Sequence, residues 1–185
     1  MEIFKLEHSQ AAYRADFALY FVAVALLAAF VVSHAAPNLQ WRGAALVMAG
    51  LASWSLIEYL LHRFVLHGVQ PFRGWHEAHH ARPHALICTP TLLSAALILV
   101  LVFLPAWSWG GLWQASALVL GVVAGYLAYA VIHHAMHHWR GRRGWLAGRK
   151  RWHALHHHAS LQGCYGVSSG LWDRVFATTP PATPR

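Results

Sequence analysis

The sequence predicts an all-α integral membrane fold, with four transmembrane helices in two hairpins and a cytoplasmic helical cap that carries a histidine-rich dimetal site. Three observations predict it: long apolar stretches, few charged residues, and histidine clusters beside the ends of those stretches. Only 11% of the 185 residues are charged, whereas a soluble domain has about 25%. The two cysteines, Cys88 and Cys164, give neither a disulfide framework nor the spacing of a zinc site.

The apolar stretches are long enough for membrane helices, each of which needs about 20 residues. Residues 83–139 contain no Asp, Glu, Lys or Arg, and the segment 105–111, with Pro105 and two tryptophans, divides them into two helices. The four expected spans cover about 17–36, 43–61, 86–104 and 112–132.

The expected organisation is a cytoplasmic amino-terminal segment 1–16, a membrane domain 17–178 and a disordered, Pro- and Thr-rich tail 179–185. The alternative for the first span is a cleaved signal peptide ending near residues 33–36. The long apolar run and the acidic residues that precede it disfavour cleavage.

The basic residues indicate the orientation of the spans. With four spans, every Lys and Arg except Arg42 falls on the side shared by the two termini and the middle loop. The positive-inside rule makes that side cytoplasmic. The net charge of +8 therefore has a membrane explanation, and we expect no nucleic-acid partner. Every histidine except His34 lies on the same side.

Ten of the histidines follow a spacing that suits metal binding. Residues three or four apart share one face of a helix, so a pair or triplet with this spacing can hold one metal ion. His62 and His67 are five apart, which suits two ligands flanking a helix end. The candidate ligands are His62 and His67; His76, His79 and His80; His133 and His137; and His153, His156 and His157.

Ten imidazoles are more than one metal ion accepts. They suit two ions with about five nitrogen ligands each and an open position for oxygen. Neutral imidazole binds Fe, Zn, Cu and Ni. Glu58, Glu77 and Asp173 are candidates for orienting the ligands from outside, because carboxylates commonly hold the second ring nitrogen of such histidines.

Other histidines and a basic segment have weaker interpretations. His8 and His34 are expected to be ordinary interfacial residues. The run between Arg140 and Arg151 either anchors the chain on anionic lipid or docks an acidic electron donor. The neighbours of the candidate ligands are possible accessory ligands: His84, His134, His138 and His158.

The four clusters, in order, resemble the motifs of the membrane fatty acid hydroxylase and sterol desaturase superfamily. Its pattern is HxxxxH or HxxxH, HxxHH, HxxxH and HxxHH. Tyr129 precedes His133 as in the family's Tyr-Asp-x-x-His, although Ala130 replaces the Asp. Residues 165–176 resemble the family's closing Gly-Val-x-x-x-x-Trp-Asp-x-x-Phe. The resemblance covers roughly residues 45–178.

The resemblance implies an oxidoreductase with two iron ions, which zinc can replace in a purified form. It implies a lipid substrate (a fatty acid, sterol or related lipid), molecular oxygen and a separate electron-donor protein. Hydroxylation and desaturation both remain open. The alternatives are a carotenoid hydroxylase and a non-catalytic membrane protein that binds metal. Metal-storage tracts are usually of low complexity, unlike these ordered clusters.

Overall fold

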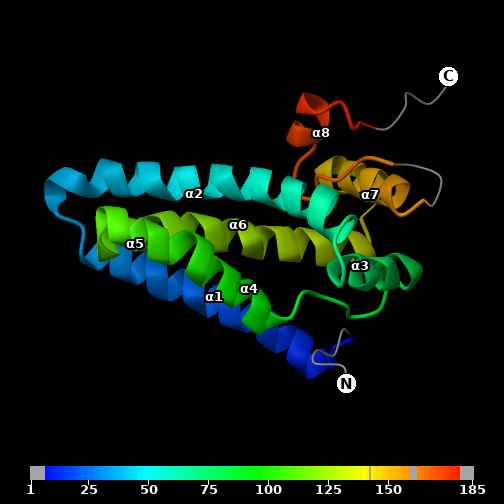
Figure 1. Ribbon diagram of the computed structural model, residues 1–185, viewed down its shortest axis with the longest axis horizontal. Helices are drawn as coiled ribbons and strands as arrows, with labels where there is room; N and C mark the ends of the chain where they lie inside the picture. The colour runs from blue at the N-terminus through cyan, green and yellow to red at the C-terminus, as the bar shows by residue number, and fades with distance from the viewer. Residues whose placement is uncertain (1–6, 142, 159–161, 180–185) are drawn as a thin grey trace. The chain divides into compact units, whose positions relative to one another are not determined.

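The computed structural model describes residues 7–141, 143–158 and 162–179. Over these residues the regular secondary structure is helical, apart from an isolated antiparallel bridge between Glu7 and Ile87, which confirms the predicted all-α class. Arg142 and most of the expected tail lie outside the described residues. The elements are α1 (Gln10–Ser33), η1 (Pro37–Leu39), α2 (Gln40–Leu60), η2 (Leu61–Leu66), α3 (Phe72–Ala81), α4 (Thr91–Ile98), η3 (Leu99–Phe103), α5 (Leu104–Gly110), α6 (Leu112–His138), α7 (Gly144–His156) and α8 (Leu171–Val175) (Figure 1).

Within the described residues, four helical segments are long and apolar enough to cross a membrane, as predicted. The first begins at Gln10, seven residues before the expected start, because the Ser9 side chain caps it by accepting a hydrogen bond from the backbone N–H of Ala12 at 3.2 Å. The four segments are Gln10–Ser33, Pro37–Leu66, Thr91–Gly110 and Leu112–His138.

The third span continues through the break expected at residues 105–111. Pro105 lies in the first turn of α5, directly after the π-helical segment η3. A proline removes one backbone donor from a helix, and a local π turn can accommodate that loss. The chain turns only at Gly111, whose positive φ of 81° ends the helix.

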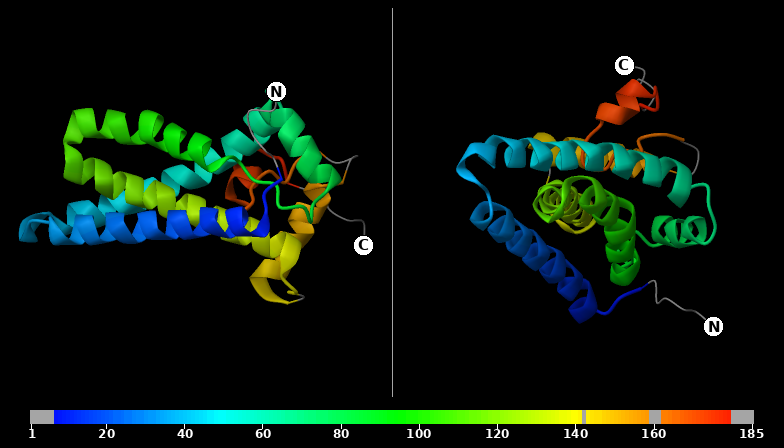
Figure 2. Two further views of the ribbon diagram at one scale, coloured as in Figure 1. Left: turned by 90° about the horizontal axis from the view of Figure 1, so that it is seen from below. Right: turned by 60° about the vertical axis from the view of Figure 1, so that its left-hand side comes forward.

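The chain forms two compact units, one within residues 1–54 and 86–127 and the other within residues 55–85 and 128–185. In the first unit, α1, α4 and parts of α2 and α6 run side by side (Figures 1 and 2). Tyr20 packs edge-on against Tyr126, with centroids 4.5 Å apart, and its hydroxyl lies 2.6 Å from Ser94 Oγ. Trp113 Nε1 donates to the carbonyl of Val31 at 3.0 Å.

Glycines allow α2 and α6 to approach closely within the first unit. A Cβ added at Gly121 would overlap the backbone oxygen of Val47, and one at Gly125 would lie 2.6 Å from the Trp54 ring. Gly121 and Gly125 form a GxxxG pair, which lets membrane helices pack backbone to backbone. The close contact between α2 and α6 therefore depends on glycine, which has no side chain, at these two positions.

The second unit contains the end of α2, η2, α3, the end of α6, α7 and α8. Its most buried side chains are Tyr59, Val167 and Asp173, each at most 1% exposed. Val167 belongs to the connection between α7 and α8. This irregular segment is therefore part of the unit's core, and it positions the histidines described below.

The close contact at Gly121 predicts that Gly121→Val destabilises the protein. A larger side chain in a packed contact costs about 1–3 kcal/mol, and here it meets backbone that cannot rotate away. The thermal unfolding midpoint in detergent should fall. Gly148→Ala is the control, because no atom lies within 4 Å of the added Cβ, and its midpoint should not fall. An unchanged midpoint for Gly121→Val would contradict the close-contact explanation.

Candidate metal centre

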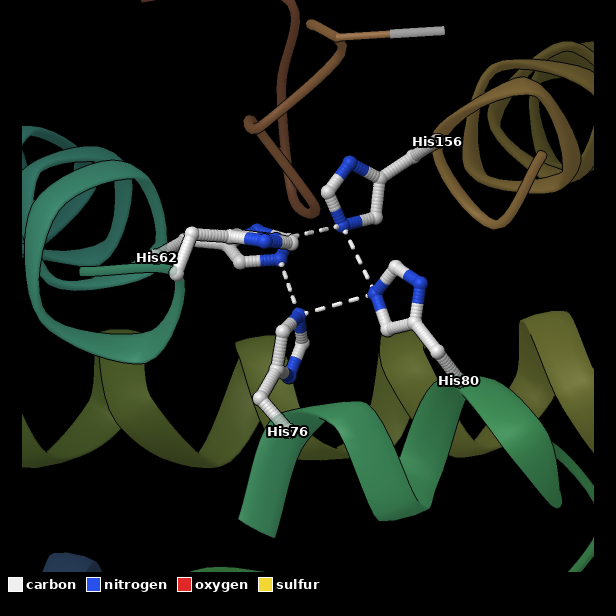
Figure 3. Close-up of side chains that lie close together, drawn as sticks. His62, His76, His80 and His156 are labelled. Carbon is white, nitrogen blue, oxygen red and sulfur yellow. Dashed lines mark hydrogen bonds between the residues drawn. The ribbon is translucent and has the colours of Figure 1, made fainter. Parts of the chain in front are cut away.

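Five histidines of the second unit point their ring nitrogens toward one another. One candidate ligand nitrogen from each of them lies within 4.8 Å of those of all the others. Figure 3 shows four of these rings, with the Nε2 of His76 3.0 Å from that of His62 and 2.9 Å from that of His80. His156 Nε2 lies 3.1 Å from His80 Nε2. This first histidine group consists of His62, His67, His76, His80 and His156.

The π-helical segment η2 explains why two ligands five residues apart belong to one group. In an α-helix, residues five apart point in different directions, whereas a π-helix pairs residue i with i+5. His62 lies inside η2 and His67 directly follows it. Their rings are stacked, with centroids 5.3 Å apart. The sequence placed these ligands at a helix end, and the structure adds that the helix widens there.

Four further histidines form a second group, in which one candidate nitrogen from each lies within 4.8 Å of the others. His137 Nε2 lies 3.2 Å from His133 Nε2 and 2.8 Å from His153 Nε2. His157 stands beside this group, with its Nε2 3.1 Å from His153 Nε2. The group itself consists of His79, His133, His137 and His153.

The structure divides each histidine triplet between the two groups, which corrects the expectation that a triplet holds one metal. On α3, His76 and His80 are four residues apart and belong to the first group, whereas the intervening His79 belongs to the second. On α7, His156 belongs to the first group and His153 to the second. Neighbouring positions such as 79 and 80 point to different sides of a helix, so α3 and α7 each serve both groups.

The donor set fits two transition-metal ions. Burial lowers the pKa of His79 to about 3, of His80 to about 4 and of His156 to about 3. These rings are therefore neutral at pH 7 and can offer a lone pair. Both ring nitrogens of His79 are buried without a hydrogen-bond partner among the described residues. Such buried nitrogens are costly unless something binds them, and imidazole suits Fe, Zn, Cu and Ni.

Backbone carbonyls of the α7–α8 connection orient two ligands of the first group. His62 Nδ1 lies 2.5 Å from the carbonyl oxygen of Tyr165, and His156 Nδ1 lies 2.9 Å from that of Gly163. A carbonyl can only accept, so both Nδ1 atoms must donate. The neutral ring then keeps its lone pair on Nε2, which faces the group.

Two buried carboxylates hold this connection in place. Asp173 accepts hydrogen bonds from the backbone N–H groups of Tyr165 at 2.8 Å and Gly166 at 2.9 Å. Glu58 accepts from those of Val167 at 2.6 Å and Ser168 at 2.7 Å. Both carboxylates were expected beside the site. They bind the backbone that carries the orienting carbonyls.

Glu77, the third expected carboxylate, forms an ion pair with Arg73 at 2.9 Å on the exposed side of α3. Its charge raises the pKa of His67 and His80 slightly against the larger effect of burial. This ion pair runs along the exposed surface of the helix, between residues four apart.

Arg149 also holds the α7–α8 connection, which the sequence interpretation missed; together with Glu58 and Asp173 it forms a clamp on this segment. It was assigned to the exposed basic run, but it is only 8% exposed. Its guanidinium donates to the carbonyl of Val167 at 3.2 Å and to that of Gly166. Arg140, Arg143 and Arg151 of the run are exposed. The charge pattern of the sequence does not distinguish the buried arginine from the exposed ones. The nearby Trp152 is the one sequence signal for burial, and the Arg149 guanidinium lies 5.0 Å from the centre of its ring.

The possible accessory histidines lie outside both groups. The rings of His134 and His138, both in α6, are stacked with their centroids 4.5 Å apart. The centroid of the His84 ring lies 6.0 Å from that of His138. His158 is exposed at the end of α7. An accessory role for these four residues stays a prediction.

The clamp predicts that Asp173→Asn weakens metal binding. Both carboxylate oxygens of Asp173 accept from backbone N–H groups, and in the variant an amide NH₂ would face one of them. The α7–α8 connection should therefore shift, and the Tyr165 carbonyl should lose its hydrogen bond from His62. Loss of such an outer partner costs about 10–100-fold in metal affinity. Competition with a chelator would measure the metal affinity of the variant. Glu77→Gln, the same chemical change at an exposed ion pair, should change the affinity far less. An equal loss of metal affinity in the two variants would contradict the role of Asp173 in orienting the ligands.

The profile of the fatty acid hydroxylase family matches residues 47–178, a range that contains all ten candidate ligands.

Several curated relatives share about a third of their aligned residues with this chain. Dihydroceramide fatty acyl 2-hydroxylase FAH2 of Arabidopsis thaliana is 32% identical over 151 residues, which cover 73% of this chain and 60% of the relative. Ceramide very long chain fatty acid hydroxylase scs7 of Schizosaccharomyces pombe is 33% identical over 71% of this chain and 41% of the relative. Fatty acid 2-hydroxylase of Homo sapiens is 30% identical over 87% of this chain and 46% of the relative. The chain thus spans about two fifths to three fifths of these relatives.

One solved structure has a similar fold. The hydroxylase domain visible in the structure of full-length scs7p superimposes with a TM-score of 0.81. The match covers 97% of this chain and 70% of that one, at 23% sequence identity. At this identity the likeness shows the fold alone.

Proposed function

Because the chain belongs to the fatty acid hydroxylase family, we propose that it is an oxygen-dependent di-iron enzyme that hydroxylates the acyl chain of a lipid. One observation carries this proposal: two adjoining groups of buried and half-buried histidines whose candidate ligand nitrogens converge, each group large enough for one metal ion. A metal store needs no such division, and two ions side by side suit a reaction with oxygen.

The chain's own residues hold and shape the centre. The first histidine group would bind one ion. The second group, with His157 beside it, would bind the other. The iron ions, when bound, supply the oxygen chemistry that an unactivated C–H bond requires. The Tyr165 and Gly163 carbonyls keep the Nε2 lone pairs of His62 and His156 directed at the first ion.

The overall reaction defines what the protein must obtain from outside. One oxygen atom of O₂ enters the C–H bond and the other leaves as water, which consumes two electrons and two protons. The electrons would come from a separate donor protein. Two of the relatives are named as 2-hydroxylases, of a dihydroceramide fatty acyl chain and of a fatty acid, and a third as a hydroxylase of the very long chain fatty acid of ceramide. We therefore propose carbon 2 of a fatty acyl chain as the position attacked, in preference to a sterol or a carotenoid.

The proposed location is a membrane with the metal centre and both termini on the cytoplasmic side. Four spans return the chain to the side on which it began. Every Lys and Arg except Arg42 belongs to that side in the sequence, and such residues favour the cytoplasm. A lipid substrate would reach the enzyme through the same membrane.

The proposed reaction predicts that His79→Ala and His156→Ala abolish turnover, because each removes a ligand from a different histidine group. The purified protein, reconstituted with iron in lipid nanodiscs, would receive a long-chain fatty acid or ceramide, a reductant and ¹⁸O₂. Mass spectrometry should detect a 2-hydroxy product with one ¹⁸O atom. His34→Ala, a change at an exposed residue after α1, should retain turnover. Full activity in either ligand variant would contradict the dimetal assignment, and labelled product at another carbon would correct the position alone.

A further inference from the structure

The short helix α8 presents an apolar surface with one cation. Leu171 is 51% exposed, Val175 59% and Phe176, which follows the helix, 43%. Arg174, among them, is also exposed. Asp173, on the opposite side of α8, is fully buried in the clamp. The helix is thus fixed to the core of the second unit by one face and leaves the other face uncovered.

A continuous series of aromatic rings connects this surface with the first histidine group. Phe176 is stacked on Tyr59, with centroids 5.2 Å apart and ring planes 13° apart. Tyr59 is completely buried and lies 6.1 Å from the Tyr165 ring. The Tyr165 ring lies 5.9 Å from His62, 5.5 Å from His67 and 5.6 Å from His156.

These contacts give a path for electrons. Electron tunnelling falls steeply with distance and is faster through closely packed conjugated rings than across gaps. Phe176, Tyr59 and Tyr165 lead from an exposed ring to rings of three proposed ligands. Hydrogen bonds position two residues of the path: the backbone N–H of Tyr165 donates to Asp173, and Tyr59 Oη lies 3.0 Å from Thr178 Oγ1.

The charge of the second unit indicates the kind of partner that fits. Its three acidic side chains are already engaged: Glu58 and Asp173 are buried in the clamp, and Glu77 pairs with Arg73. Exposed arginines of this unit therefore outnumber exposed carboxylates. A partner with an acidic face is attracted to such a surface and associates faster at low salt. The exposed members among the described residues are Arg73, Arg82, Arg140, Arg143, Arg151 and Arg174.

We propose that the exposed face of α8 docks an acidic one-electron carrier protein, and that electrons pass through Phe176, Tyr59 and Tyr165 to the first histidine group. This inference rests on the proposed function, because only a redox-active centre needs a donor. Each hydroxylation takes two electrons, so two molecules of reduced carrier are oxidised for each product, while two protons come from solvent. Arg174 meets the acidic face, and the apolar residues of α8 exclude water from the contact.

Stopped-flow reduction of the iron-loaded protein by an acidic plant-type [2Fe–2S] ferredoxin tests the docking face. Nanodiscs of uncharged phosphatidylcholine remove any effect of lipid charge. Arg174→Glu should raise the half-saturating ferredoxin concentration about tenfold at low salt, with the difference shrinking at high salt. Arg143→Glu makes the same charge change at another exposed arginine of the unit. It should change the half-saturating ferredoxin concentration by less than about twofold.

Tyr165→Leu tests the path separately from docking, with Tyr165→Phe, which keeps the ring, as its control. The leucine keeps the backbone carbonyl that orients His62 but removes the aromatic ring from the series. The maximal reduction rate should fall several-fold, with the half-saturating concentration and the iron content unchanged. Reduction by dithionite, a small reductant that needs no docking face, should be unaffected in Arg174→Glu.

Several results would overturn the proposal. Equal effects of Arg174→Glu and Arg143→Glu would show a response to net charge and no docking at α8. A defect that arises only when phosphatidylserine is added would assign the face to anionic lipid. An unchanged maximal rate in Tyr165→Leu, or an equal loss in Tyr165→Phe, would remove the Tyr165 ring from the path. A centre that dithionite cannot reduce would contradict the proposed function itself. Normal dithionite reduction with unchanged ferredoxin kinetics in Arg174→Glu would contradict the docking inference alone.

Discussion

The structure of the second unit depends on one constraint: many imidazole nitrogens are removed from water without enough protein hydrogen-bond partners. A buried polar atom without a partner costs free energy, and neither ring nitrogen of His79 has a hydrogen-bond partner in the part of the chain that the structure describes. Protonation does not relieve the cost, because burial holds the pKa values of these rings well below 6.5. Metal binding satisfies the nitrogens, so binding free energy becomes part of the folding free energy.

The surrounding elements follow from that constraint. Histidines from η2, α3, α6 and α7 must converge, and α3 and α7 each contribute to both groups because adjacent positions of a helix point to different sides. The α7–α8 connection then fixes ring orientation through two carbonyls, and Asp173, Glu58 and Arg149 fix the connection. A residue such as Asp173 thus acts on His62 through the backbone of Tyr165, without touching the ring.

The sequence predicted the four spans, the all-α fold and the histidines that the structure brings together, because hydropathy and ligand spacing are local patterns. It did not predict features that depend on tertiary contacts. The π turn at His62, the continuation of the third span past Pro105 and the burial of Arg149 have no local signal of comparable strength. Likewise, the triplet spacing shows that His76, His79 and His80 can be ligands but not which of two ions each one meets.

The most direct test of the two-group arrangement is the iron content of the purified protein after anaerobic reconstitution, measured by elemental analysis against protein concentration. Two iron ions per chain are predicted, one for each histidine group. A content of one ion per chain, with all ten candidate histidines intact, would contradict the account, because a single ion cannot satisfy two groups whose ligands alternate along the same helices.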